Sequence, residues 1–175
     1  MKRFLTAFIL VLGAASLHAQ GSIPLLDKVA GHRAEFEYRY LLSEGGKAFR
    51  EVTSGHVTVE DNAFRITGLN LVVVSDGRTR WMMDPVAEEV LIEKVETDNL
   101  FTNPALLISS YRSHLDMIKV KSSGPDSLDA VVTFDEDVLG EFIIKGVKFL
   151  PRGDKKDFTV DVKSLGENYL ITDLR

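Results

Sequence analysis

The chain has 175 residues, no cysteine, and a net charge of −5 from 21 basic and 26 acidic side chains. The lack of cysteine excludes disulfides, thiolate metal sites, cysteine nucleophiles and a lipid attached to an N-terminal cysteine. The acidic balance opposes nucleic-acid binding, which needs a basic surface to displace counterions, and it offers no polybasic membrane anchor.

The N-terminus has the pattern of a secretory signal peptide. Lys2 and Arg3 precede a charge-free apolar run at 4–17, and the small residue Ala19 follows it. A basic start, a short apolar stretch and a small residue at the cut are typical of such a leader, so we predict cleavage after Ala19. An uncleaved anchor is the alternative, although about 20 apolar residues are needed to span a bilayer.

The mature chain, residues 20–175, is expected to fold as a single domain with one core. Loss of the leader removes two basic residues and leaves 19 basic against 26 acidic side chains, a net charge of −7. No second apolar run of membrane length follows. We therefore expect a soluble, monomeric protein in the periplasm.

A short amphipathic helix should open the mature chain. Ser22 is placed as an N-cap before Pro24, and Gly31 as the C-cap. Leu26 and Val29 belong to its apolar stripe. A helix of this length is marginal in water, so the stripe must dock on the rest of the domain.

Most of the remaining chain shows the alternation and the turn residues of β-strands. Gly55 lies inside the second strand and predicts a bulge or a sharp bend. The run at 71–75 is apolar on both faces and needs cover on two sides. Strands are predicted at 32–42, 48–60, 63–67, 71–75, 79–83, 89–95, 116–122, 130–134, 142–150, 157–165 and 169–174.

One helix interrupts the strands. Asn103 and Pro104 supply an N-cap and a proline at the first helical position, and the apolar residues that follow, up to Leu115, surround most of the helix. Burial inside a curved sheet would explain so wide an apolar arc. Ten or eleven antiparallel strands in one domain must curl, form a sandwich or close.

The segment from Val74 to Pro85 reads Val-Ser-Asp-Gly-Arg-Thr-Arg-Trp-Met-Met-Asp-Pro. It resembles a segment of the LolA family of periplasmic outer-membrane lipoprotein carriers, in which a Ser-Asp-Gly turn leads to a tryptophan and then to Asn-Pro or Asp-Pro. The order of a short helix, six strands, a helix and further strands is also similar to that family. The resemblance thus extends over most of the mature chain.

The resemblance implies a mainly β, α+β fold: a strongly curved antiparallel sheet that forms an incomplete β-barrel covered by short helices. Between sheet and helical lid lies a cavity for acyl chains. Ordinary core packing is the alternative for each lining residue, and for Trp81 in particular. The expected lining residues are Leu26, Val29, Phe36, Phe64, Ile66, Trp81, Met83, Leu106, Leu107 and Ile108.

The function implied by the resemblance is a carrier that buries the acyl chains of lipoproteins and shuttles them towards the outer membrane. Its partners would be the lipoproteins, an inner-membrane lipoprotein-releasing complex and an outer-membrane acceptor. No cofactor and no nucleic acid are expected. The alternative is a periplasmic half-barrel that senses a lipid or a protein without transferring cargo.

Two features depart from the family pattern. The family has an arginine in a Lys-Arg-Pro-like turn that is thought to hold the lid closed, whereas this chain has Glu60-Asp61-Asn62 there. Arg65 lies on the opposite face and is a poor substitute. The well-known carriers also continue with an additional segment beyond the last strand, which here ends close to Arg175.

Catalytic patterns have little support in this sequence. His32, His56 and His114 lack the spacing of a metal site, and Gly-x-Ser-x-Gly and P-loop motifs are absent. Neighbouring carboxylates, such as those at 135–137, fall in turns or on solvent faces, where they read as solvated surface. We expect no enzyme, and a hydrolase acting on envelope lipids is the disfavoured alternative.

Overall fold

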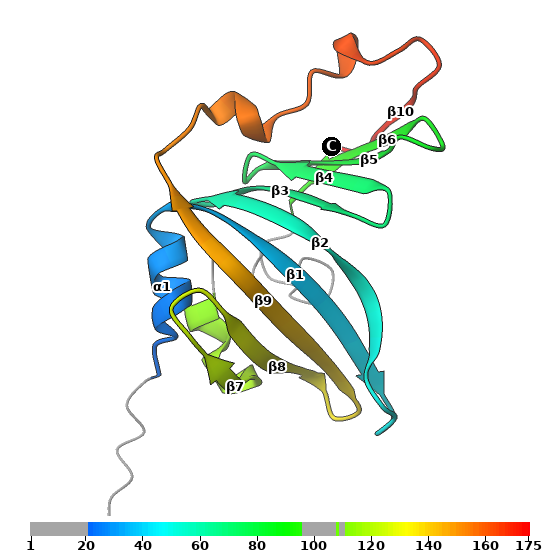
Figure 1. The fold of residues 1–175 in the computed structure, drawn as a ribbon. Coiled ribbons are helices and arrows are strands. Elements are labelled where there is room, and N and C mark those ends of the chain that lie inside the picture. Colours follow the sequence, from blue (N-terminus) through cyan, green and yellow to red (C-terminus); the bar gives the residue numbers. More distant parts are fainter. Residues whose placement is uncertain (1–20, 96–107, 109–110) are drawn as a thin grey trace, which may run out of the picture.

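A computed structural model describes residues 21–95, 108 and 111–175 of the chain. Within this part, ten strands form one sheet in the order β10-β6-β5-β4-β3-β2-β1-β9-β8-β7. The sheet is strongly curved and its two edge strands, β10 and β7, do not meet, so the barrel is incomplete (Figure 1). The predicted mainly β fold is confirmed.

The elements follow one another with short connections along the described chain. The first half contains α1 (Pro24–Ala30), β1 (Arg33–Glu44), β2 (Arg50–Glu60), β3 (Ala63–Gly68), β4 (Leu71–Ser75), β5 (Thr79–Asp84) and β6 (Glu89–Lys94). The second half contains the 3₁₀ helix η1 (Tyr111–Met117), β7 (Ile118–Ser123), β8 (Leu128–Asp135), β9 (Val138–Leu150), η2 (Lys155–Phe158), η3 (Val162–Ser164) and β10 (Leu170–Asp173). None of the described helices is long and apolar enough to cross a membrane.

Helix α1 forms where the sequence predicts it, but its N-terminal cap differs. The N-cap is Ile23 instead of Ser22, and no side chain of the cap residue bonds to the helix. The Ile23 N–H instead donates to the Tyr111 hydroxyl, at 3.2 Å. The partner of this helix end is therefore a residue far along the chain, which a local capping pattern could not reveal. Pro24 and the C-cap Gly31 lie as predicted.

The three long strands β2, β1 and β9 form the centre of the sheet. β1 pairs antiparallel with both neighbours, and its register with β2 shifts between Tyr40 and Leu41. The bulge predicted at Gly55 is therefore wrong in position. Gly55 has another role, because a Cβ at this residue would lie 1.7 Å from the Thr67 carbonyl oxygen. β2 and β3 approach each other there, where their pairing ends at His56 and Thr67.

The C-terminal region contains two corrections to the sequence-based strands. Residues 157–165 form no strand, because Asp154 and Asp161 accept hydrogen bonds from Lys156 N and Lys163 N and fold the chain into successive 3₁₀ turns. β10 is a strand, but it pairs parallel to β6 and not antiparallel. A parallel pair needs a long connection, and residues 95–169 supply it.

Only part of the second predicted helix lies within the described residues. Its beginning lies outside the described residues, while Ile108 is helical and buried. From Tyr111 onwards the chain is a 3₁₀ helix broken at His114, whose φ of −130° and ψ of 20° are not helical. The predicted continuation of one helix to Leu115 is therefore wrong.

Candidate functional site

Apolar side chains of the concave face of the sheet surround a cavity of about 80 Å³. Its wall is aromatic and aliphatic, and its described polar atoms are two tyrosine hydroxyls and one threonine hydroxyl. The lining residues come from β1, β2, β3 and β9, with one residue from the segment before η1. They are Phe36, Tyr38, Tyr40, Thr53, Val57, Phe64, Ile66, Ile108, Phe142 and Ile144.

The strand register explains why these side chains meet. Residues paired directly across neighbouring strands point to the same face, and successive residues alternate. Phe36 is paired with Val57, Val57 with Ile66, Ile66 with Val73, and Val73 with Met82. One uninterrupted apolar row therefore crosses the concave face from β1 to β5.

A second hollow of about 340 Å³ continues the cavity towards β4 and β5. It shares Tyr38, Thr53, Phe64 and Ile66 with the first, so the two form one extended concave site. Its other described lining residues are Val52, Gly68, Leu69, Leu71, Val73, Arg80 and Met82. Among them Val52, Leu69 and Leu71 are exposed large apolar residues.

The two tyrosines of the cavity bring their hydroxyls into an apolar wall. The Tyr38 hydroxyl lies 3.1 Å from Thr53 Oγ1. The Tyr40 ring stacks on Phe142 with centroids 4.6 Å apart, and burial, followed by the nearby Glu44, raises the pKa of Tyr40 to about 12. The Tyr40 hydroxyl therefore remains neutral near pH 7 and adds no charge to the cavity wall.

The structure brings four of the predicted lining residues together. Phe36, Phe64, Ile66 and Ile108 all contribute to the cavity wall. Leu26 and Val29 belong to the same core cluster, but they are 1% and 2% exposed and do not line the cavity. Leu106 and Leu107 lie outside the described residues. A role of any of these residues in acyl binding stays a prediction.

Trp81 and Met83 lie on the other face of the sheet. Trp81 pairs with Val74, and both belong to a separate core with Val90 and Ile92. Val160, Val162, Leu165 and Tyr169 of the C-terminal segment, residues 151–169, cover this core. Trp81 and Met83 therefore do not line the concave cavity as predicted. Of the run at 71–75, Val74 belongs to this core and Val73 packs against the concave one, whereas Leu71 is exposed.

Several residues that line the concave site were not predicted from the sequence, and only some of them carried a recognisable signal. Tyr38 and Tyr40 lie on the same alternating face of β1 as Phe36. Val73 and Met82 follow from the row through Ile66, but only once the pairing of β3, β4 and β5 is known. Phe142 and Ile144 carried no signal of a concave position, because β9 joins β1 from a distant part of the chain.

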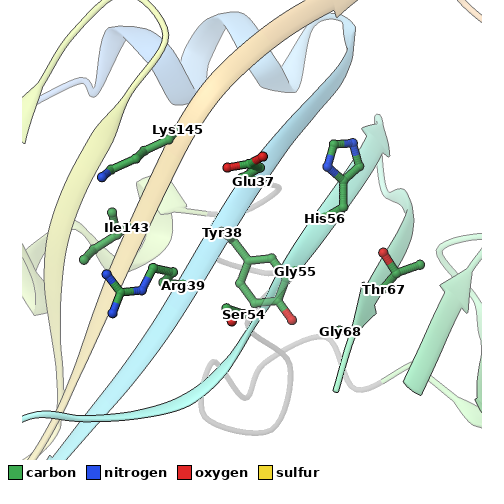
Figure 2. A pocket seen from close by; sticks show the side chains of 10 residues that line it. All are labelled: Glu37, Tyr38, Arg39, Ser54, Gly55, His56, Thr67, Gly68, Ile143 and Lys145. Carbon is green, nitrogen blue, oxygen red and sulfur yellow. The ribbon is translucent and has the colours of Figure 1, made fainter. Parts of the chain in front are cut away.

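A third hollow lies on the convex face of the sheet. It has a volume of about 520 Å³, and Figure 2 shows its lining side chains on β1, β2, β3 and β9. Glu37 on β1 lies in register with His56 on β2 and with Lys145 on β9. Arg39 binds Glu51 at 2.6 Å, and hydrogen bonds from Ser54 and then Arg39 lower the pKa of Glu51. The surface is polar and carries both charges, unlike the concave cavity.

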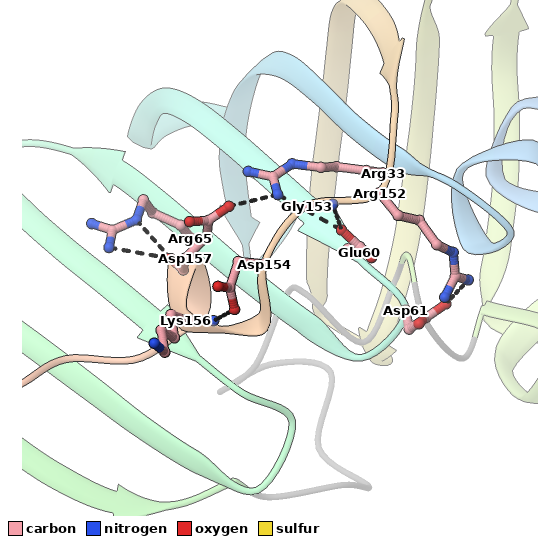
Figure 3. A network of polar contacts seen from close by, with 9 residues as sticks. All are labelled: Arg33, Glu60, Asp61, Arg65, Arg152, Gly153, Asp154, Lys156 and Asp157. Carbon is pink, nitrogen blue, oxygen red and sulfur yellow. Dashed lines mark hydrogen bonds and ion pairs between the residues drawn. The ribbon is translucent and has the colours of Figure 1, made fainter.

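Polar contacts fasten the start of the C-terminal segment to the ends of β1, β2 and β3 (Figure 3). Arg33 Nη1 lies 2.7 Å from Asp157 Oδ2, and Arg65 Nη2 donates to the Asp157 carbonyl at 3.3 Å. The turn that departs from the family pattern takes part: Glu60 accepts from the Gly153 N–H at 3.1 Å, and Asp61 binds a nearby arginine at 3.0 Å. The turn at 60–62 therefore helps to hold the C-terminal segment, which packs over the core around Trp81.

A second polar contact fastens α1 to η1. The Tyr111 hydroxyl and the Arg112 guanidinium both donate to Asp27 Oδ1, with Arg112 Nη2 at 2.6 Å. The bond from Tyr111, followed by the bond from Arg112, holds the pKa of the Asp27 carboxyl below its ordinary value. Asp27 thus links the first helix to the chain that follows Ile108.

The hydrogen bonds to Asp27 make the free energy of unfolding depend on pH in the acidic range. Because the folded pKa lies below the unfolded one, its contribution is complete above about pH 4 and is lost as the pH falls through the folded pKa. Asp27→Asn should lower the urea midpoint at neutral pH and flatten its decline below about pH 4. Asp137→Asn, in the exposed β8–β9 turn, is the control. An unchanged acid decline in Asp27→Asn would contradict the assignment.

The described residues contain no group of three or more His, Asp or Glu placed to hold a metal ion. No protein-family model matches the chain. The chain is similar to an outer-membrane lipoprotein carrier protein. That relative, from Glaesserella parasuis serovar 5 (strain SH0165), is 26% identical over 167 residues, which cover 88% of this chain and 79% of the relative.

Proposed function

We propose that this protein binds the acyl chains of lipoproteins in its concave cavity and carries them across the periplasm towards the outer membrane. The observation that carries the proposal is the uninterrupted apolar row from Phe36 to Met82, which faces two connected hollows. The similarity to an outer-membrane lipoprotein carrier protein supports the same function. The function involves no chemical conversion.

The energetics of such binding suit a carrier. Each methylene group removed from water contributes about 0.8 kcal/mol, so a stretch of about five contributes about 4 kcal/mol. That gain is enough to hold an acyl chain in transit. It is also small enough to be exceeded by a membrane, which buries the whole chain. Delivery then needs an acceptor that offers more apolar contact than the cavity does.

The leader predicted at residues 1–19 would export the chain to the periplasm. Loading from an inner-membrane lipoprotein-releasing complex and delivery to an outer-membrane acceptor complete the proposed route. The exposed Val52, Leu69 and Leu71 at the second hollow provide an apolar rim where a chain can enter.

Ile66→Asp tests the cavity, because Ile66 lines both hollows. A carboxylate in this apolar wall should lower the affinity for a triacylated lipopeptide by at least about 100-fold, since burying an unpaired charge costs several kcal/mol. Thr67→Asp is the matched control, because Thr67 is the next residue of β3 and lines the convex hollow. Titration calorimetry of both variants gives the comparison, with circular dichroism to establish folding. Equal affinities would overturn the cavity assignment.

Native mass spectrometry of the protein recovered from the periplasm of its own cells tests the cargo. Bound triacylated lipoprotein in the wild type, and its loss in Ile66→Asp, is the result expected of a carrier. Free lipid without lipoprotein would replace the carrier by the lipid-sensing alternative. If the protein carries neither lipoprotein nor lipid at any lipoprotein concentration, the concave face is ordinary hydrophobic core and not a binding site.

A further inference from the structure

Two hydroxyl groups lie where the two concave hollows join. Four described residues line both hollows, and two of them, Tyr38 and Thr53, are polar. Their hydroxyl oxygens lie 3.1 Å apart, and both side chains are half-buried. A ligand that extends from the 340 Å³ hollow into the 80 Å³ cavity would therefore pass this hydroxyl pair.

Two glycines leave space for the Tyr38 side chain. Gly55 lies directly opposite Tyr38 in the pairing of β1 with β2, and Thr53 lies two residues earlier on the same face of β2. Gly68 at the end of β3 is also close, because a Cβ there would lie 3.2 Å from the Tyr38 hydroxyl oxygen. With no side chain at either glycine, the phenol ring can reach Thr53.

The hydroxyl pair has one hydrogen more than its own contact uses. Each hydroxyl carries one donor hydrogen and two acceptor lone pairs. Whichever of the two donates, the other keeps its hydrogen, since the contact between them takes only one. Within the described part of the chain, neither hydroxyl makes another hydrogen bond. One donor is therefore available to a ligand that enters the site.

We propose that this hydroxyl pair donates a hydrogen bond to the ester or amide carbonyl of a bound acyl chain. The inference rests on the proposed function. Sites for apolar ligands characteristically contain a few polar groups that fix the orientation of the ligand, and the carbonyl oxygen is the acceptor that an acyl chain brings. The pair gives the site a preference that apolar burial alone cannot give: acyl chains over alkyl chains of the same length.

The test compares 1-decanoylglycerol with 1-O-decylglycerol, which differ only by a carbonyl in the ester and a methylene in the ether. Titration calorimetry of the wild type should show about fivefold tighter binding of the ester, the effect of one hydrogen bond between neutral groups. The double variant Tyr38→Phe with Thr53→Val should bind both lipids with the affinity of the ether. Both hydroxyls are removed together, because either one left alone could still donate.

Phenylalanine and valine keep the shapes of the two side chains, and removing both partners leaves no unpaired hydroxyl. Unchanged ether binding by the double variant shows that its cavity is intact. Tyr40→Phe is the matched control and should keep the preference, since Tyr40 lies two residues along β1 and lines the 80 Å³ cavity but not the 340 Å³ hollow.

Three results would overturn the hydroxyl anchor but leave the proposed function standing. They are equal affinities of the wild type for both lipids, a preference that survives in the double variant, and a preference that is lost in Tyr40→Phe. No binding of either lipid to the wild type would instead refute acyl binding itself.

Discussion

Replacing Trp81 by alanine should lower the free energy of unfolding by about 3–5 kcal/mol, the usual cost of removing a large buried aromatic side chain. Trp81 is 8% exposed and packs with Val74, Val90 and Ile92 beneath the C-terminal segment. None of its core contacts belongs to the concave cavity. The affinity for acyl chains should therefore stay within about twofold of the wild type wherever the variant is folded.

Urea unfolding followed by far-ultraviolet circular dichroism measures this effect, because Trp81 is the single tryptophan and its loss removes the fluorescence signal. Met82→Ala is the reciprocal control. Met82 is the next residue of β5 but lines the concave hollow, so its truncation should weaken acyl binding more than stability. Trp81→Phe provides a milder change in the same core. A stable Trp81→Ala that no longer binds acyl chains would place the indole in the binding path.

Gly55→Ala should destabilise the protein by about 3 kcal/mol, at the upper end of overpacking effects. A Cβ at this position would meet the carbonyl oxygen of Thr67 at 1.7 Å and Cα of Gly68 at 2.9 Å. These are backbone atoms, which cannot turn away as a flexible side chain can. β2 and β3 would therefore have to move apart at Gly55.

The Trp81 fluorescence reports this change in urea titrations. Gly166→Ala is the matched control, because a Cβ at Gly166 meets nothing within 4 Å and its φ lies outside the left-handed region. The control should shift the urea midpoint little or slightly upwards, through the lower entropy of its unfolded chain. Equal midpoints for the two variants would show that β2 and β3 yield at Gly55 without cost.

The sequence predicts the position of a residue best where the alternation of apolar residues along one strand is enough to identify the buried face. Alternation along β1 identified its buried face, and Phe36 does line the cavity. On β5 the run Trp-Met-Met at 81–83 is apolar on both faces, so its pattern could not tell which side is concave. Only the pairing of Val73 with Met82 decides this, and it depends on contacts between strands.

The C-terminal segment shows a different limit of sequence reasoning. Residues 157–165 have the alternating apolar residues of a strand, and these do become partly buried. Asp154 and Asp161, however, bond to the backbone two residues on, which favours turns over an extended ladder. The apolar pattern therefore revealed that the segment packs on the protein, but not how its backbone runs.

The parallel pairing of β10 with β6 also bears on the rate at which the protein can fold. Leu170 N donates to Glu88 O and Leu174 N to Ile92 O, so residues 170–174 extend the sheet at β6, a strand from near the middle of the chain. Closing a long loop costs conformational entropy. For the same reason, β-folds with many contacts between distant residues fold slowly. Until residues 151–169 dock on the sheet, the Trp81 core stays uncovered.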